Sequence, residues 1–159
     1  MADAHELEQK FWKALNSDRT VMLGTAEVAS RPMTGIAEEN RSPMWFFTAD
    51  NTDLAKALEG GQSQIASGSL TAKDHAVFAA FSGPVVIDND REVIDRLWNP
   101  FVAAWFEGKD DPRLRLLRMD LSSAHVWLNE NSMLAGVKLL LGIDPKESYR
   151  AKAGDVDLG

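Results

Sequence analysis

Residues 43–53 read PMWFFTADNTD and carry the clearest structural signal in the chain. The first half is rich in aromatic residues that favour strands, so Pro43–Thr48 is predicted to be a β-strand. The polar Asn51-Thr52-Asp53 that follows supplies N-cap chemistry for a short helix over Leu54–Leu58, and Gly60-Gly61 ends that helix. The stretch therefore predicts a strand that leads directly into a capped helix.

Short β-like runs and helices lie on both sides of this unit. A helical stripe of apolar residues predicts a helix over Ala4–Asn16, and Asp88-Asn89-Asp90 caps a second helix that Pro100 ends. The Gly83-Pro84 pair predicts a bend or bulge within a long strand. The further predicted strands are Thr20–Ala26, Arg31–Ala37, Gln64–Leu70, His75–Ile87, Leu114–Asp120 and Ala124–Leu128.

The order of these elements predicts a mostly β protein. Few β-α-β alternations occur, so a mostly antiparallel barrel or sandwich with helical decoration fits better than a parallel sheet. No linker or repeat divides the chain, which predicts one domain over residues 1–159 with a core at about residues 5–130. The remaining tail, 131–159, is expected to be helical or irregular, with an apolar helical patch over Met133–Leu141 and a polar end from Lys146.

Composition excludes several classes of function. The 159 residues are 45% apolar and 26% charged, as in an ordinary globular domain, and the net charge of −7 repels nucleic-acid backbones. No cysteine is present, so disulfides and thiol chemistry are excluded, and the three histidines are isolated, so no metal site is expected. No apolar stretch approaches the length of a membrane span and the start has no secretory pattern, so we expect a cytoplasmic protein.

The remaining polar residues suit a binding site better than a catalytic centre. Neither a glycine-rich phosphate loop nor a nucleophile elbow is present. Arg31 begins a predicted strand, and Thr48, Thr52 and Lys56 follow the aromatic strand, where hydroxyls and an ammonium could meet one phosphate. The alternative interpretation of the same residues is a capped helix with a solvated lysine.

Four blocks, in order along residues 5–130, add a family resemblance. The blocks are Ser30-Arg31-Pro32-Met33, then Trp45-Phe46-Phe47-Thr48, then Phe81-Ser82-Gly83 leading to Asp88, and last Leu97-Trp98-Asn99-Pro100 through Trp105-Phe106 to Asp110-Asp111-Pro112. Together they make the chain resemble the pyridoxamine-5′-phosphate-oxidase-like FMN-binding split barrels, in their general stress protein branch. The resemblance implies a six-stranded, antiparallel, Greek-key-like barrel that forms a homodimer with FMN at the subunit interface.

The resemblance also implies a set of cofactor-binding residues. An arginine like Arg31 binds the FMN phosphate in that family, and a residue like Thr52 contacts it too. The partner subunit contributes an aromatic wall, for which Trp105 is the matching candidate. The flavin ring and ribityl chain are bordered by residues that correspond to Pro32, Met33, Thr34, Phe46, Phe47 and Thr48.

One position departs from the family pattern. The family often carries Ser-x-Lys after the aromatic strand, with the lysine on the phosphate, whereas this chain has Thr52-Asp53-Leu54. Lys56, two residues further, is the candidate replacement. A missing charge-assisted contact costs about 1.5–3 kcal/mol, so weaker FMN binding is expected.

Two functions stay open at this stage. One is a stress-related, FMN-dependent oxidoreductase of a small molecule, and the other is a non-enzymatic flavin-binding or regulatory module. No catalytic acid or base can be assigned from the sequence. A homodimer is expected in either case, because apolar strand faces such as those of Phe78 and Phe81 need cover.

Overall fold

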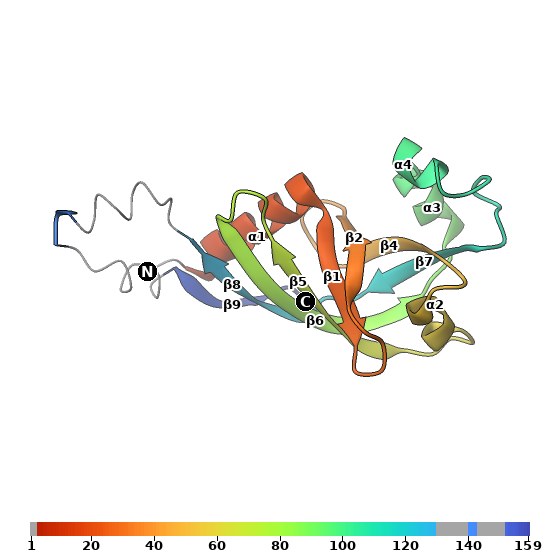
Figure 1. The fold of residues 1–159 in the computed structure, drawn as a ribbon, viewed down its shortest axis with the longest axis horizontal. Coiled ribbons are helices and arrows are strands. Elements are labelled where there is room, and N and C mark those ends of the chain that lie inside the picture. The colour runs from red at the N-terminus through yellow and green to blue at the C-terminus, as the bar shows by residue number, and fades with distance from the viewer. Residues whose placement is uncertain (1–2, 130–139, 143–151) are drawn as a thin grey trace.

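The computed structural model describes residues 3–129, 140–142 and 152–159 (Figure 1). Its helices are α1 (Ala4–Asp18), α2 (Asp53–Leu58), α3 (Arg91–Leu97) and α4 (Pro100–Ala103). The strands in this part of the chain are β1 (Thr20–Thr25), β2 (Arg31–Thr34), β3 (Ile36–Ala37), β4 (Met44–Ala49), β5 (Gln64–Thr71), β6 (Val77–Ile87), β7 (Leu114–Met119), β8 (Ser123–Leu128) and β9 (Ala153–Asp157).

The strands form one antiparallel sheet that curls back on itself. The main path runs β2-β1-β5-β6-β7-β4-β3, while β8 pairs with both β6 and β9. The two ends of the path, β2 and β3, are consecutive in the chain and are separated only by Gly35. The sheet therefore nearly closes into a barrel, with α1 lying against it beside β8 and β9 (Figure 1).

The mostly β, antiparallel split barrel predicted from the sequence is confirmed, but the count of six strands is wrong in detail. The described residues hold nine strands: the seven strand ranges predicted from the sequence become eight because Arg31–Ala37 divides at Gly35 into β2 and β3, and β9 adds one from the tail. The tail is thus not only helical or irregular: Val156 is buried and β9 pairs with β8. Most of the helical patch predicted at Met133–Leu141 lies outside the described residues.

The barrel core is packed around aromatic side chains from α1 and β6. Phe11 is fully buried, and its ring centroid lies 4.9 Å from that of Trp12 and 5.7 Å from that of Phe81, both in edge-on geometry. Phe81 is therefore covered within its own chain and does not need a partner subunit to bury it. Phe78, three residues earlier, is half-buried.

Gly83-Pro84, where the sequence predicted a bend or bulge, lies where β6 changes its partner strand, while the register of β6 with β5 continues unbroken. On one side of this pair β6 is bonded to β8 (Ser82 opposite Ser123), and on the other side it is bonded to β7 (Val85 opposite Met119). Three residues on the β7–β8 side thus face two on β6. A Cβ on Gly83 would lie 2.0 Å from the carbonyl oxygen of Asp120, so only glycine fits here.

Candidate functional site

A cavity of about 680 Å³ opens where the barrel splits, between β2 and β4. Ile36 and Ala37 of β3 pair with Trp45 and Met44 of β4, whereas the preceding strand β2 pairs with β1. The chain therefore leaves β4 at Gly35, and the space between the two diverging strands forms the cavity. Its volume lies within the range of about 300–1,000 Å³ that is common for small-molecule sites.

Most of the predicted site residues line this cavity. Eight of the ten meet there: Arg31, Pro32, Met33, Thr34, Phe47, Thr48, Thr52 and Trp105. Two do not. Side chains alternate along a strand, so Phe46 lies fully buried in the barrel core while Phe47, on the opposite face, lines the cavity. Thr48, near the end of β4, lines the cavity as well. Lys56 is exposed on α2 and does not line the cavity.

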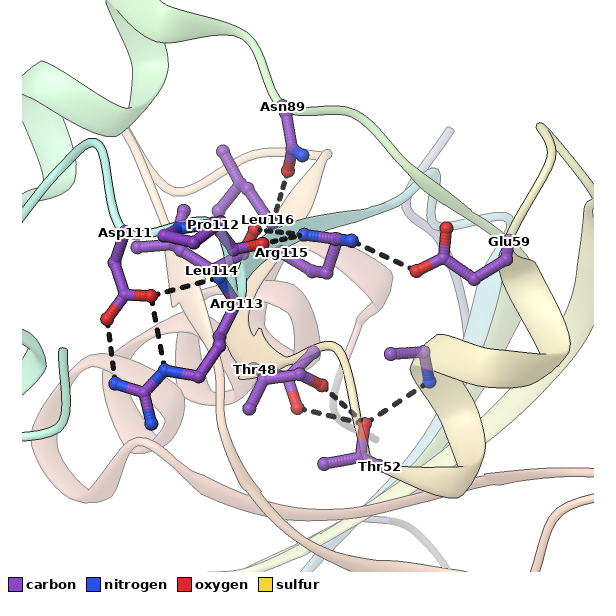
Figure 2. A network of polar contacts seen from close by, with 12 residues as sticks. Thr48, Thr52, Glu59, Asn89, Asp111, Pro112, Arg113, Leu114, Arg115 and Leu116 are labelled. Atoms are coloured by element: carbon purple, nitrogen blue, oxygen red, sulfur yellow. Dashed lines mark hydrogen bonds and ion pairs between the residues drawn. The ribbon is translucent and has the colours of Figure 1, made fainter.

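Two threonine hydroxyls are coupled at the end of β4 (Figure 2). The Oγ1 atoms of Thr48 and Thr52 lie 3.2 Å apart, and Thr52 also accepts from the Ala55 amide at 3.2 Å, as the N-cap of α2. Thr52 can donate its proton to the Ala49 carbonyl at 3.1 Å or to Thr48. In the second arrangement the Thr48 proton is free to be donated into the cavity.

Arg113 lines the cavity as well and was not predicted from the sequence. Its Nε and Nη2 donate to Asp111 at 3.2 and 2.7 Å, as Figure 2 shows. The Asp111 side chain is 1% exposed and also accepts from the amides of Glu107 and Arg113, both at 2.9 Å. The two backbone amides hold the Asp111 carboxylate, and the carboxylate in turn holds one edge of the Arg113 guanidinium. The Arg113 side chain is itself 54% exposed.

These contacts shift both protonation equilibria toward the charged forms. The hydrogen bonds from the Arg113 guanidinium, followed by those from the two backbone amides, lower the pKa of Asp111 well below its ordinary value. The hydrogen bond and the charge of Asp111 raise the pKa of Arg113, with smaller contributions from the carboxylates of Glu107 and Asp50. Arg113 is therefore a permanent cation beside the cavity.

The charges that line the cavity are opposite in sign to that of the whole chain. Three arginines line it, Arg19, Arg31 and Arg113, against a single carboxylate, Asp18, one oxygen of which accepts from the Lys73 amide at 2.7 Å. The chain as a whole carries a net charge of −7. The cavity is thus a local cationic site that suits an anionic ligand.

The wall that faces these polar groups is apolar and aromatic. Phe47, Val102 and Phe106 line it, and the Phe47 ring packs edge-on against Trp98 at a centroid distance of 6.2 Å. Phe101 and Trp105, on and just after α4, are each 79% exposed and form its rim. A cationic end combined with an apolar wall fits a flat ring that carries an anionic tail.

The ionisable side chains that line the cavity among the described residues are three arginines and one aspartate, so no histidine, lysine, cysteine or glutamate is available there as a general acid or base. The same part of the chain contains no group of three histidine, cysteine, aspartate or glutamate residues arranged to hold a metal ion. None of the helices described is long and apolar enough to cross a membrane.

Comparison with known proteins identifies the family. The model of the family described as "Pyridoxamine 5′-phosphate oxidase like" matches residues 6–148. The chain belongs to this family. It is 50% identical to a general stress family protein of Xanthomonas campestris, covering 83% of this chain and 93% of that one with a TM-score of 0.76.

Two further relatives carry descriptive names. A general stress FMN/FAD binding protein of Xanthomonas citri is 49% identical over 80% of this chain and 92% of its own, again with a TM-score of 0.76. General stress protein 26 of Bacillus subtilis is 35% identical over 43 residues, which span 27% of this chain and 31% of the relative's length. The family resemblance found in the sequence is thereby confirmed.

Proposed function

We propose that this member of the pyridoxamine 5′-phosphate oxidase like family binds FMN in the cavity between β2 and β4. The single observation that carries the proposal is the composition of that cavity, which joins three guanidinium groups to an aromatic wall within about 680 Å³. The name of the Xanthomonas citri relative, an FMN/FAD binding protein at 49% identity, supports a flavin as the ligand.

The residues of the cavity match the two chemically different parts of FMN. Arg31 has no hydrogen-bond or ion-pair partner within the described residues, so its guanidinium is available to a phosphate, for which its planar fork is suited. Thr48 can supply a hydroxyl donor once Thr52 donates to it. Phe47 and Trp105 offer apolar surface to the ring.

Within this proposal the protein orients the cofactor and shields it. A bound flavin supplies hydride and electron transfer, while the chain contributes binding, orientation and electrostatics. We propose an oxidoreductase that acts on a small molecule. A non-enzymatic flavin-binding module is the second candidate, and it is favoured because no histidine, lysine, cysteine or glutamate of the described residues lines the cavity.

We also propose that the functional unit is a homodimer with the flavin at the interface. The support is on α4 and the residue that follows its C-cap, where Phe101 and Trp105 present two large apolar side chains at the rim of the cavity with 79% of each exposed. A second subunit would cover these rings and narrow the opening of the cavity.

Titration of FMN and riboflavin tests the ligand and its orientation together. Wild-type protein is expected to bind FMN and to give a flavin absorbance spectrum, Arg31→Lys to bind FMN more weakly, and Arg31→Ala to lose about a hundredfold in FMN affinity. Riboflavin affinity should be nearly unchanged in both variants, because riboflavin lacks the phosphate. Absence of FMN binding by the wild type would refute the proposal. Equal losses of affinity for both ligands would show that Arg31 does not bind the phosphate.

Steady-state oxidation of NADH or NADPH by the FMN-loaded protein separates the two candidate functions. Turnover well above that of free FMN supports the oxidoreductase. Stable FMN binding with turnover no faster than free FMN supports the binding module.

A further inference from the structure

We propose that Arg113 is a second ligand of the flavin phosphate, acting together with Arg31, and that Asp111 is the residue that positions it. This inference rests on the proposed function and adds to it the cation that the sequence pattern lacks. Its support is the place of Arg113 in the barrel, its free donors, and the fact that no lysine of the described residues lines the cavity.

Arg113 lies at the same end of the cavity as the threonine pair. The Asp50 amide donates to the Arg113 carbonyl at 2.8 Å, and Ala49 pairs with Leu114, so Arg113 stands beside the point where β4 ends. Thr48 and Thr52 flank that point on the same chain segment, and Figure 2 shows Thr48 lying between Arg113 and Thr52.

Arg31 points to the same end through the sheet register. Ile36 pairs with Trp45 and Ala37 with Met44, so the chain followed backward from Ile36 runs toward the C-terminal end of β4. Arg31 is the first residue of β2 and therefore lies toward that end, while Arg19 lies at the other end of β2, next to the position where Thr20 pairs with Thr34. The cavity thus has two arginines near the end of β4.

Arg113 keeps free donors even though it is ion-paired. A guanidinium carries five N–H groups, and Asp111 accepts one from Nε and one from Nη2. The three others have no partner among the described residues, so they remain for a ligand. Most other arginines in the described part are paired with carboxylates and do not line the cavity: Arg41, Arg91, Arg96, Arg115 and Arg118.

The helix that follows β4, α2, places no cation in the lining of the cavity. Leu54 stands where the family often has its lysine, and this side chain is 1% exposed. Lys56, the candidate from the sequence, does not line the cavity. A dianionic phosphate at the Thr48–Thr52 end would therefore depend on arginines from β2 and from the turn before β7.

The position of Asp111 explains how an exposed arginine can be aimed. Asp111 and Pro112 begin a turn that is closed by a hydrogen bond from the Leu114 amide to the Asp111 carbonyl at 3.0 Å. The buried carboxylate then holds Nε and one Nη, which leaves the opposite edge of the guanidinium to face the cavity. The nearby carboxylates of Asp50 and Glu107 oppose an anion, so the proposal requires that Arg113 outweigh them.

FMN and riboflavin titrations on Arg113 variants test the inference. Arg113→Ala is expected to lower FMN affinity about ten- to hundredfold, and Arg113→Lys to lower it less, with riboflavin affinity nearly constant in both. The salt dependence of FMN affinity should also become weaker in Arg113→Ala, because one charge contact is lost. Arg41→Ala is the matched control, since Arg41 is an exposed arginine that pairs with Glu39 and does not line the cavity.

Asp111→Asn tests the positioning role. Asparagine keeps one oxygen acceptor but replaces the other with an NH2 group, which cannot accept, so one backbone amide and one guanidinium nitrogen lose their acceptor. The charge that holds the guanidinium is also removed, so FMN affinity should fall while riboflavin affinity does not. A loss that is equal for both ligands would mean that Asp111 only supports the local fold.

The outcomes separate this inference from the proposed function. If the wild type binds FMN, Arg31→Ala weakens it and Arg113→Ala does not change the ratio of FMN to riboflavin affinity, the inference is overturned and the function stands. An equal loss of both ligands in Arg113→Ala overturns it as well, because Arg113 would then contact the ring or support the fold. If the wild type binds no flavin, the proposed function itself fails.

Discussion

The closed side and the split side of the barrel contain similar residue types, but those residues are buried on one side and exposed on the other. On the closed side, where β5, β6 and β8 pair without interruption, Phe81 packs against Phe11 and is 3% exposed. On the split side, between β2 and β4, Phe101 and Trp105 are each 79% exposed and Arg31 has no partner among the described residues. One side satisfies its groups internally, and the other leaves them for a ligand.

The difference teaches where stability and function reside in this fold. Substitutions on the closed side should lower the free energy of unfolding, and should lower ligand affinity only where the protein unfolds. Substitutions on the split side should lower ligand affinity and leave the free energy of unfolding nearly unchanged, because exposed groups contribute little to folding. Three variants test this separation, beginning with the one of largest expected effect.

Gly83→Ala should destabilise the closed side of the barrel. A Cβ at this position lies 2.0 Å from the backbone oxygen of Asp120, which cannot move without opening the β6–β7 or β6–β8 ladder. The free energy of unfolding should fall by about 3 kcal/mol in a urea titration. Ser82→Ala, one residue earlier on β6, is the control and should change it by less than about 0.5 kcal/mol. Equal stability of the two variants would contradict the close approach of Asp120 to Gly83.

Thr52→Ala should have an intermediate effect, because Thr52 lines the cavity and also caps α2. It removes the N-cap acceptor of the Ala55 amide and the partner of the Thr48 hydroxyl. The expected loss is about 1 kcal/mol of stability, together with weaker FMN binding. Thr52→Ser keeps the hydroxyl and should retain both properties in the same thermal melts and titrations. A serine variant that behaves like the alanine variant would show that the methyl group, not the hydroxyl, matters.

Trp105→Ala should change stability least. Because 79% of the side chain is exposed, the free energy of unfolding should shift by less than about 0.5 kcal/mol. FMN affinity should fall roughly two- to tenfold if the ring stacks on the flavin. Ile65→Ala removes an exposed apolar side chain that does not line the cavity and serves as the control for both measurements. A large drop in melting temperature for Trp105→Ala would instead place the ring in the folded core.

Local signals in the sequence account for much of the fold. The predicted strand over Pro43–Thr48 differs from β4 by one residue at each end, because its aromatic residues favour a strand and Thr52 begins the next helix as its N-cap. Asp90 likewise caps α3, accepting from the amides of Glu92 and Val93. Caps and strand formers act within a few residues, so they can be recognised without the tertiary structure.

Features that depend on distant partners were not predicted. β9 contains one buried residue, Val156, in a polar segment, and it is ordered by pairing with β8 rather than by its own propensity. Arg113 reaches the cavity because β7 pairs with β4 and because Asp111 holds its guanidinium. The sequence contained one usable sign, the Asp111-Pro112 turn, but a turn residue does not show which side of a barrel it faces. Phe46 and Phe47 were both predicted to line the site, but only Phe47 does. Adjacent aromatic residues cannot be assigned to core and cavity before the two faces of the strand are known.

The contact between α1 and β9 has a consequence for synthesis of the protein on the ribosome. Leu7, near the start of α1, is 2% exposed and belongs to the same core as Val156 and Leu158, and its Cδ1 lies close to Gly154. The helix α1 therefore meets one of its packing partners only when residues 154–158 have been made. Until then, part of its apolar face stays open on the nascent chain, where chaperones that bind exposed apolar surface would find it.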